Sequence, residues 1–222
     1  MKLSSYACPF VVFVGLLIPS ASVFAAIDVI PKEVTVETDA TSVQVINHGD
    51  RPEYVDISLS RLLNPGAPLE EEHLEPVSDA AHPSLYAYPF RMSLAAGQTK
   101  TLTLKPLRPV ETETVYRLEV KPVVKVLGAE KKTTSASVTV NLAFSGLVRQ
   151  LPARQRETLA VECGEQGATV TATGNVRSRV EGAKVEGRVL DTFNVYPGVP
   201  LPVGGKVVEI PGHSVCRGRT DG

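Results

Sequence analysis

A run of alternating apolar and small or polar residues, SVTVNLAFSGLVR, occupies positions 137–149 of the chain. Successive side chains of a β-strand project to opposite faces, so this run places Val138, Val140, Leu142 and Phe144 in one apolar row. Two arrangements produce such a row. It belongs either to a half-buried strand of an antiparallel sandwich or to an edge strand that lends its row to another protein lacking a strand. Periodicity alone does not distinguish the two.

The remainder of the chain consists of similar short segments. Apolar and polar residues alternate between turn-forming stretches, the chain contains 17 Gly and 17 Pro, and helical periodicity is almost absent. These features predict an all-β protein made of β-sandwiches. The expected strands are residues 27–36, 41–46, 53–62, 85–94, 99–104, 115–126, 137–149, 158–161, 168–173, 185–190 and 206–210.

Three segments carry more specific expectations. Pro31 interrupts the first expected strand, and proline is tolerated there only at an edge or where a strand switches between sheets. Residues 70–83 are acidic and contain prolines, so we expect a surface loop with the run Glu70–Glu72 in solvent. The expected strand at 115–126 has one apolar and one polar face. The two faces consist of Tyr116, Leu118 and Val120, and of Arg117, Glu119 and Lys121.

Residues 1–25 have the features of a signal peptide. Lys2 precedes an apolar stretch at 10–18, and small residues lead to a cleavage position before Ala26. The stretch is shorter than the roughly 20 residues of a membrane span, so we expect an exported protein without membrane insertion. After the signal peptide we expect two domains, at 26–152 and 153–222.

Two cysteines, Cys163 and Cys216, remain after the expected signal peptide. An even number in an exported chain favours a disulfide, and two free buried thiols are the alternative. A bridge between them would close most of the small second domain into one loop, which stabilises it by about 4 kcal/mol. Without nearby histidines the two cysteines do not complete a tetrahedral metal shell.

The sequence gives little support for catalysis or for nucleic-acid binding. The formal net charge is -1 and Trp is absent, so a basic or stacking surface for nucleic acid is not expected. No nucleophile elbow, phosphate loop or zinc-protease motif occurs. We therefore expect no catalytic residues, no metal and no cofactor. The histidines, none of them paired at ligand spacing, are His48, His73, His82 and His213.

Several segments resemble, in their order, those of periplasmic pilus chaperones of the chaperone–usher pathway. The resemblance is to the alternate type, which serves fimbriae such as CFA/I, and it runs over most of the chain after the signal peptide. The segments are residues 115–118 (VYRL), the basic hairpin at 127–132, the alternating run, residues 147–152 (LVRQLP) and residues 173–177 (TGNVR).

This resemblance implies a fold, a location and partners. It implies two immunoglobulin-like domains arranged as a boomerang in a periplasmic protein. Such a chaperone donates a β-strand to pilin subunits and delivers them to an outer-membrane usher for pilus assembly. Whether the free protein caps the same edge by forming a homodimer stays open. The alternative function is that of a structural or adhesive exported β-sandwich, such as a pilus subunit or surface module.

The resemblance also implies roles for individual residues. Lys32 and Arg117 are the expected anchor for the pilin's terminal carboxylate, because Ser145 stands where the family has a lysine. Glu113 and Arg149 are the expected pair between the domains. The residues that would fill the pilin groove are Ala136, Val138, Val140, Leu142 and Phe144.

For Arg117 a second arrangement is open, in which it is an ordinary strand-face cation paired with Glu119.

Overall fold

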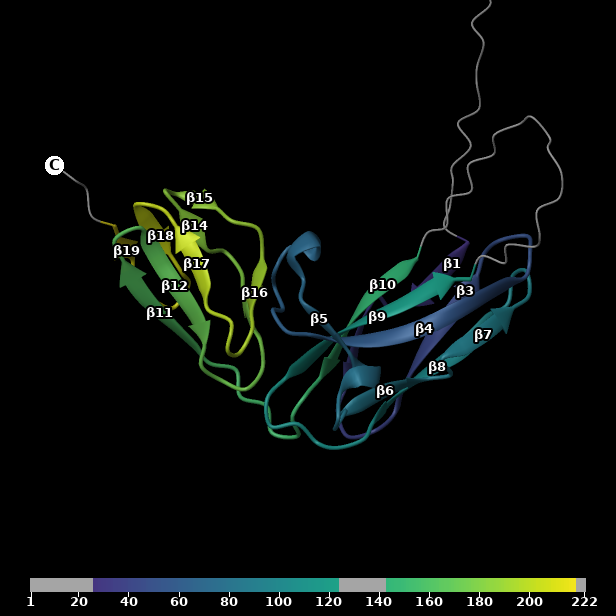
Figure 1. The fold of residues 1–222 in the computed structure, drawn as a ribbon. Helices are drawn as coiled ribbons and strands as arrows, with labels where there is room; N and C mark the ends of the chain where they lie inside the picture. Colours follow the sequence, from purple (N-terminus) through teal and green to yellow (C-terminus); the bar gives the residue numbers. More distant parts are fainter. Residues whose placement is uncertain (1–25, 124–142, 219–222) are drawn as a thin grey trace, which may run out of the picture.

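The computed structural model describes residues 26–123 and 143–218, which form two β-sandwich lobes that meet at an angle (Figure 1). The two lobes have separate apolar cores. The predicted domain boundary at 152/153 lies in the segment that joins β10 of the first lobe to β11 of the second. Among the described residues, no helical segment has the length and hydropathy to cross a membrane.

The first lobe packs two sheets face to face, and the order of their strands is fixed by the ladders. One sheet has the order β1-β3-β8-β6, and the other has the order β2-β10-β9-β4-β5 with β7 also paired to β4. The strands of the first sheet are β1 (Ile27–Ile30), β3 (Thr41–Asn47), β8 (Thr99–Pro106) and β6 (Leu85–Tyr88). Those of the second are β2 (Glu33–Val36), β10 (Phe144–Gln150), β9 (Thr114–Pro122), β4 (Glu53–Leu62), β5 (Leu74–Pro76) and β7 (Arg91–Leu94).

Two of the crossings between the two sheets occur at prolines. The sequence allowed an edge or a switch between sheets at Pro31, and the structure has both, because β1 and β2 are edge strands of different sheets. Residues 85–94, expected as a strand or an extended piece, form two strands, because Pro89 lies between β6 and β7, which belong to different sheets. Proline lacks the amide donor that a continuous ladder requires, so each crossing begins a new strand.

Alternation along the strands creates the first core. In β9 the predicted apolar face points between the sheets, where Tyr116, Leu118 and Val120 are 3% exposed or less. The same alternation buries Val43 and Val45 of β3 completely. Removing such side chains from water is the main force that holds the two sheets together.

Strand β10 has two neighbours along only part of its length. It pairs antiparallel with β9 from Phe144 to Gln150. Its parallel ladder with β2 begins only at Leu147, which is registered with Glu33. Residues 144–146 are therefore paired with β9 alone, among the described residues.

The second lobe consists of three small sheets with the strand orders β11-β12-β17, β13-β16 and β15-β14-β18-β19. Its core includes Val170 and Val208, both fully buried. Cys163 in β11 and Cys216 in β19 form a disulfide, as predicted, with a Sγ–Sγ distance of 1.98 Å. The strands are β11 (Leu159–Gly164), β12 (Gly167–Ala172), β13 (Ser178–Val180), β14 (Lys184–Val185), β15 (Arg188–Val189), β16 (Phe193–Val195), β17 (Leu201–Gly204), β18 (Val207–Glu209) and β19 (Cys216–Arg217).

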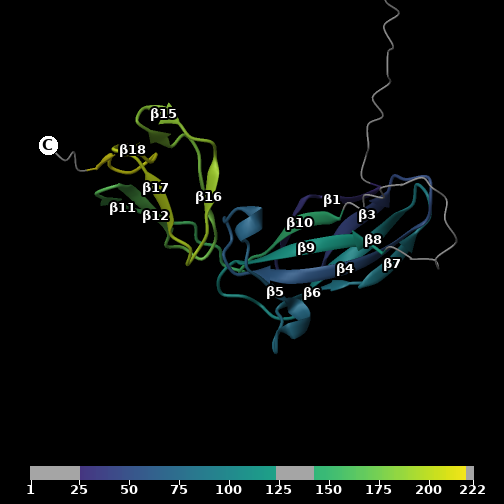
Figure 2. The same ribbon diagram turned by 45° about the horizontal axis from the view of Figure 1, so that its top comes forward.

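Two sequence expectations about local structure are wrong. The strand predicted at 185–190 is a hairpin, because Glu186 and Gly187 adopt positive φ angles of 52° and 79° between β14 and β15. The surface loop predicted at 70–83 contains β5, which adds to the edge of β4. Two short 3-10 turns, η1 (Leu69–Glu71) and η2 (Val77–Asp79), flank β5. In both ribbon views η1 stands between β16 of the second lobe and β9 and β10 of the first (Figures 1 and 2).

Candidate functional site: the cleft between the lobes

A small apolar cluster joins the two lobes at the bottom of the cleft. Tyr196 of the second lobe packs with Leu62 of β4 and Val115 of β9, and Leu147 of β10 lies against the same cluster. Outward-facing residues of the β10-β9-β4 sheet therefore face the second lobe. This is the face on which the cations predicted to bind a client's carboxylate were expected.

Four charged residues surround this cluster. Arg149 donates from Nε to Glu113 Oε1 at 2.6 Å and from Nη2 to Glu113 Oε2 at 3.0 Å, so the predicted pair is brought together. The backbone amide of Arg177, in the second lobe, also donates to Glu113, at 2.6 Å. Arg177 Nη2 in turn lies 2.7 Å from Glu33 of β2. Glu113 thus binds groups from both lobes, and its side chain has no exposure to solvent.

Arg177 was not singled out from the sequence, although it ends the TGNVR segment. Burial lowers the pKa of its guanidinium, but hydrogen bonding to Tyr196 and the charge of Glu33 outweigh burial, so the net pKa is raised. Arg177 therefore keeps its charge between the lobes.

Asn175, in the second lobe, binds both the β8–β9 loop of the first lobe and the segment that joins the two lobes. Its side-chain amide donates to the carbonyl groups of Glu111 at 3.1 Å and Arg154 at 2.8 Å. Its side-chain oxygen accepts from the amide of Arg156 at 2.7 Å. These bonds, with the charged network, link the second lobe to the first.

Lys32 lies in the short connection before β2, beside the singly paired part of β10. Its carbonyl group accepts the amide of Leu147 at 3.1 Å, and its Nζ lies 4.8 Å from the centre of the Phe144 ring. Its ammonium forms an ion pair with Asp28, and the hydrogen bond from Lys32 lowers the pKa of that carboxyl group. The side chain of Lys32 is 65% exposed.

Arg117 projects from β9 directly opposite Leu147. Its guanidinium binds both carboxylate oxygens of Glu72, with Nε 3.0 Å from Oε2 and Nη2 against Oε1. The alternative partner, Glu119, binds Lys121 instead, at 2.8 Å. The prediction that the acidic run lies in solvent is wrong for Glu72, whose side chain is only 6% exposed. The reason is that the turn η1 brings Glu72 back onto the sheet.

The apolar row that would fill a pilin groove is described only at one end. Ala136, Val138, Val140 and Leu142 lie outside the described residues. Phe144 is half-buried and packs against the core of the first lobe.

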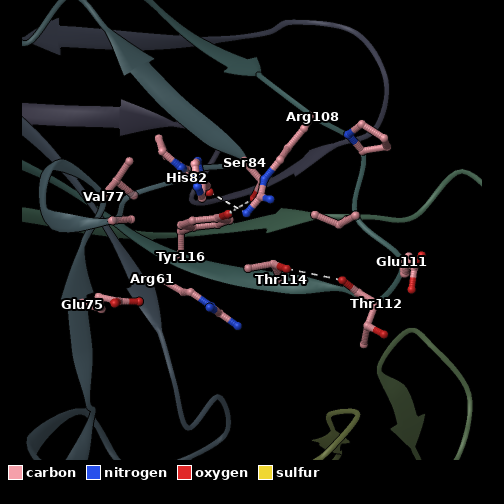
Figure 3. Close-up of a pocket in the computed structure, with 14 residues that line it drawn as sticks. Arg61, Glu75, Val77, His82, Ser84, Arg108, Glu111, Thr112, Thr114 and Tyr116 are labelled. Atoms are coloured by element: carbon pink, nitrogen blue, oxygen red, sulfur yellow. Dashed lines mark hydrogen bonds between the residues drawn. The ribbon is translucent and has the colours of Figure 1, made fainter.

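A separate cavity of about 330 Å³ opens at the end of the first sandwich, and its lining includes Glu111 and Thr112 of the β8–β9 loop (Figure 3). There the Tyr116 hydroxyl lies 2.7 Å from Ser84 Oγ and donates to Gln150 Oε1 at 3.2 Å. The Gln150 amide donates to the carbonyl groups of Ser84 and Arg108. Burial raises the pKa of Tyr116, and the hydrogen bond with Ser84 and the charges of Arg61 and Arg108 oppose that rise. The sequence did not predict this buried network. Its side chains hydrogen-bond to one another and to the carbonyl groups of Ser84 and Arg108.

Nothing in the described part of the chain suggests a metal centre, since no cluster of three or more His, Cys, Asp or Glu side chains is placed to hold an ion.

No family model matches the chain. A CFA/I fimbrial protein of Escherichia coli, named as one of the subunits of that fimbria, is 27% identical over 143 residues, which cover 63% of this chain and 59% of that protein. The chain thus spans less than two thirds of this relative. The solved class 5 fimbriae chaperone CfaA superimposes with a TM-score of 0.64 at 18% identity, over 87% of this chain and 99% of that one.

The chain has the fold of the fimbrial chaperones. A chain from a solved complex of a chaperone with a tip adhesin, concerned with CFA/I fimbriae, gives the same TM-score of 0.64 at 20% identity. That match covers 88% of this chain and 99% of the other. The shared fold includes both immunoglobulin-like domains, since nearly the full length of each solved chain is matched.

Proposed function

We propose that the protein is a periplasmic chaperone that binds pilin subunits by donating part of β10 and its preceding residues, and hands them to an outer-membrane usher. The observation that carries the proposal is the one-sided pairing of residues 144–146, which have β9 on one side and no strand ladder on the other among the described residues. An unpaired strand edge is a template for an added strand.

The energetic argument uses the apolar row that ends at Phe144. Val138, Val140 and Leu142 continue the alternation of Phe144 in the sequence. Inserting four such side chains into the groove of a strand-deficient pilin would contribute about 6–12 kcal/mol before ordering costs. That is enough to hold a pilin that does not fold alone, and it requires no catalytic step.

The cleft supplies a second point of attachment. Lys32 and Arg117 lie on either side of Leu147, one beside β2 and one on β9. We propose that these two cations receive the client's terminal carboxylate, since cations beside a pairing strand also set the register of the added strand.

Co-expression with candidate pilin subunits tests the proposal. Wild-type protein should co-purify with a pilin, and Leu142→Asp should lose at least about 90% of it, because a charge cannot enter an apolar groove. Asn141→Asp is the matched control, because Asn141 does not belong to the apolar row in the sequence pattern. Both variants should unfold at the temperature of the wild type. Retention of pilin by a folded Leu142→Asp protein would refute strand donation.

A second copy of this chain is the competing occupant of the same edge. Sedimentation of the protein purified without pilin shows whether the edge is free in a monomer or covered in a homodimer. A capped dimer should dissociate when pilin is added.

A further inference from the structure

Both cations proposed to bind the client carry a carboxylate from their own chain. Arg117 is paired with Glu72 and Lys32 with Asp28. The two pairs differ in burial, because the Arg117 and Glu72 side chains are 16% and 6% exposed and that of Lys32 is 65% exposed. The Arg117 site is therefore a desolvated, two-pronged carboxylate site that is already filled.

The loop that supplies Glu72 is held in place at its base. The Asn64 side chain donates to the carbonyl group of Glu71 at 2.8 Å and accepts the amide of His73 at 2.7 Å. The amide of Leu63 donates to the carbonyl group of His73 at 2.9 Å. These bonds close the loop on both sides of Glu72, so its carboxylate is directed onto β9 by fixed backbone.

The tip of the same loop touches the second lobe. At Gly66, whose φ of 96° suits only glycine, an added Cβ would stand 3.6 Å from the Tyr196 ring. The loop therefore occupies the space between the lobes, as η1 does in both ribbon views.

We propose that Glu72 is an internal stand-in for the client's terminal carboxylate, which fills the Arg117 site in the free protein and is displaced when a pilin binds. This inference rests on the proposed chaperone function. One two-pronged carboxylate replaces another, so Arg117 is never left buried without a partner, which would cost several kcal/mol. The exchange also excludes stray anions from the cleft, because only a ligand that gains strand pairing at β10 competes with the tethered Glu72.

Binding of a peptide to Glu72→Gln tests this exchange. The probe is a synthetic peptide with the C-terminal strand sequence of the pilin that co-purifies with the wild type, made with a free carboxylate and as its amide. Removing the internal charge should tighten binding of the free-acid peptide about tenfold, equal to 1.4 kcal/mol, and should leave the amide unchanged. Glu71→Gln, on the same turn but exposed, is the matched control and should change neither affinity.

A gain of equal size for the amidated peptide, or no gain for the free acid, would overturn the exchange. If Glu72→Gln does not fold, the wild type still gives an answer through the side-chain carboxyl ¹³C resonance of Glu72. That resonance should shift when the free-acid peptide is added and stay in place with the amide, and an unchanged resonance with both would also overturn the exchange. Failure of the proposed chaperone function gives another result, which is that no pilin co-purifies with the wild-type protein.

Discussion

The Arg149 guanidinium binds the Glu113 carboxylate through two hydrogen bonds, of 2.6 and 3.0 Å, at the point where the two lobes meet. Glu113 precedes β9 and Arg149 lies in β10, and the backbone amide of Arg177 brings the second lobe to the same carboxylate. Because this carboxylate is fully buried, these partners take the place of the water that would otherwise solvate it. The angle between the lobes is thus linked to a charge that water does not solvate.

Removing one member of the Arg149–Glu113 pair should lower the free energy of unfolding. Arg149→Met should lower the free energy of unfolding by about 3–5 kcal/mol, since Glu113 would stay buried without its main partner. Adding Glu113→Gln should restore part of that loss. Urea unfolding measures the free energy of unfolding of the single and the double variant. Arg91→Met is the control, because Arg91 is 83% exposed in its pair with Asp56 and should cost less than about 1 kcal/mol. A loss for Arg149→Met no larger than that for Arg91→Met would contradict the buried-charge argument.

The apolar cluster at Tyr196 should determine how rigidly the lobes are held. Tyr196→Ala removes the ring that packs on Leu62 and Val115, so we expect a wider distribution of angles between the lobes. Small-angle scattering should record a larger radius of gyration than for the wild type. Tyr88→Ala, at a residue that is 60% exposed in the first lobe, should leave the scattering curve unchanged.

Much of the first lobe was predictable because its strands are long and alternate. Tyr116, Leu118 and Val120 were assigned to one apolar face from spacing alone, and the structure buries all three. The missing amide donor of Pro31 limited its strand to an edge or a switch between sheets, and the structure has both there. The disulfide followed from two cysteines in a chain that carries an export signal.

The errors have equally physical causes. Strands of two to four residues, such as β14 and β15, are too short to show alternation, so the hairpin at Glu186 has the sequence pattern of one strand. Glu72 was assigned to solvent because a charge run normally is solvated, and no local signal shows that η1 folds back onto Arg117. Arg177 was missed as a charged partner because its contacts with Glu33 and Glu113 span the two lobes.

The disulfide should stabilise the second lobe mainly through its unfolded state. Cys163 and Cys216 are 53 residues apart, so the bridge restricts a long loop of the unfolded chain. Replacing both by Ala should lower the free energy of unfolding of that lobe by about 4 kcal/mol, measured with urea under non-reducing conditions. Dithiothreitol should weaken the wild type and leave the double variant unchanged. Equal sensitivity of the two proteins would mean that the bridge is not the source of the stability.

Tyr116 should make stability depend on pH in the alkaline range. Burial raises the pKa of its hydroxyl above the ordinary value near 10, so the unfolded chain releases this proton at a lower pH than the folded chain does. The stabilisation is therefore complete below about pH 10 and is lost as pH rises through the folded-state pKa. Urea unfolding between about pH 8.5 and pH 11 should show this decline.

The matched variants separate Tyr116 from the other tyrosines. Tyr116→Phe should lose about 1 kcal/mol at pH 8.5, because its hydrogen bonds with Ser84 and Gln150 disappear, and should then decline less steeply with pH than the wild type. Tyr88→Phe, at an exposed ring, should follow the wild-type curve. If Tyr116→Phe and wild type declined in parallel, the alkaline loss would have to come from another group, and the buried hydroxyl would contribute only through its hydrogen bonds.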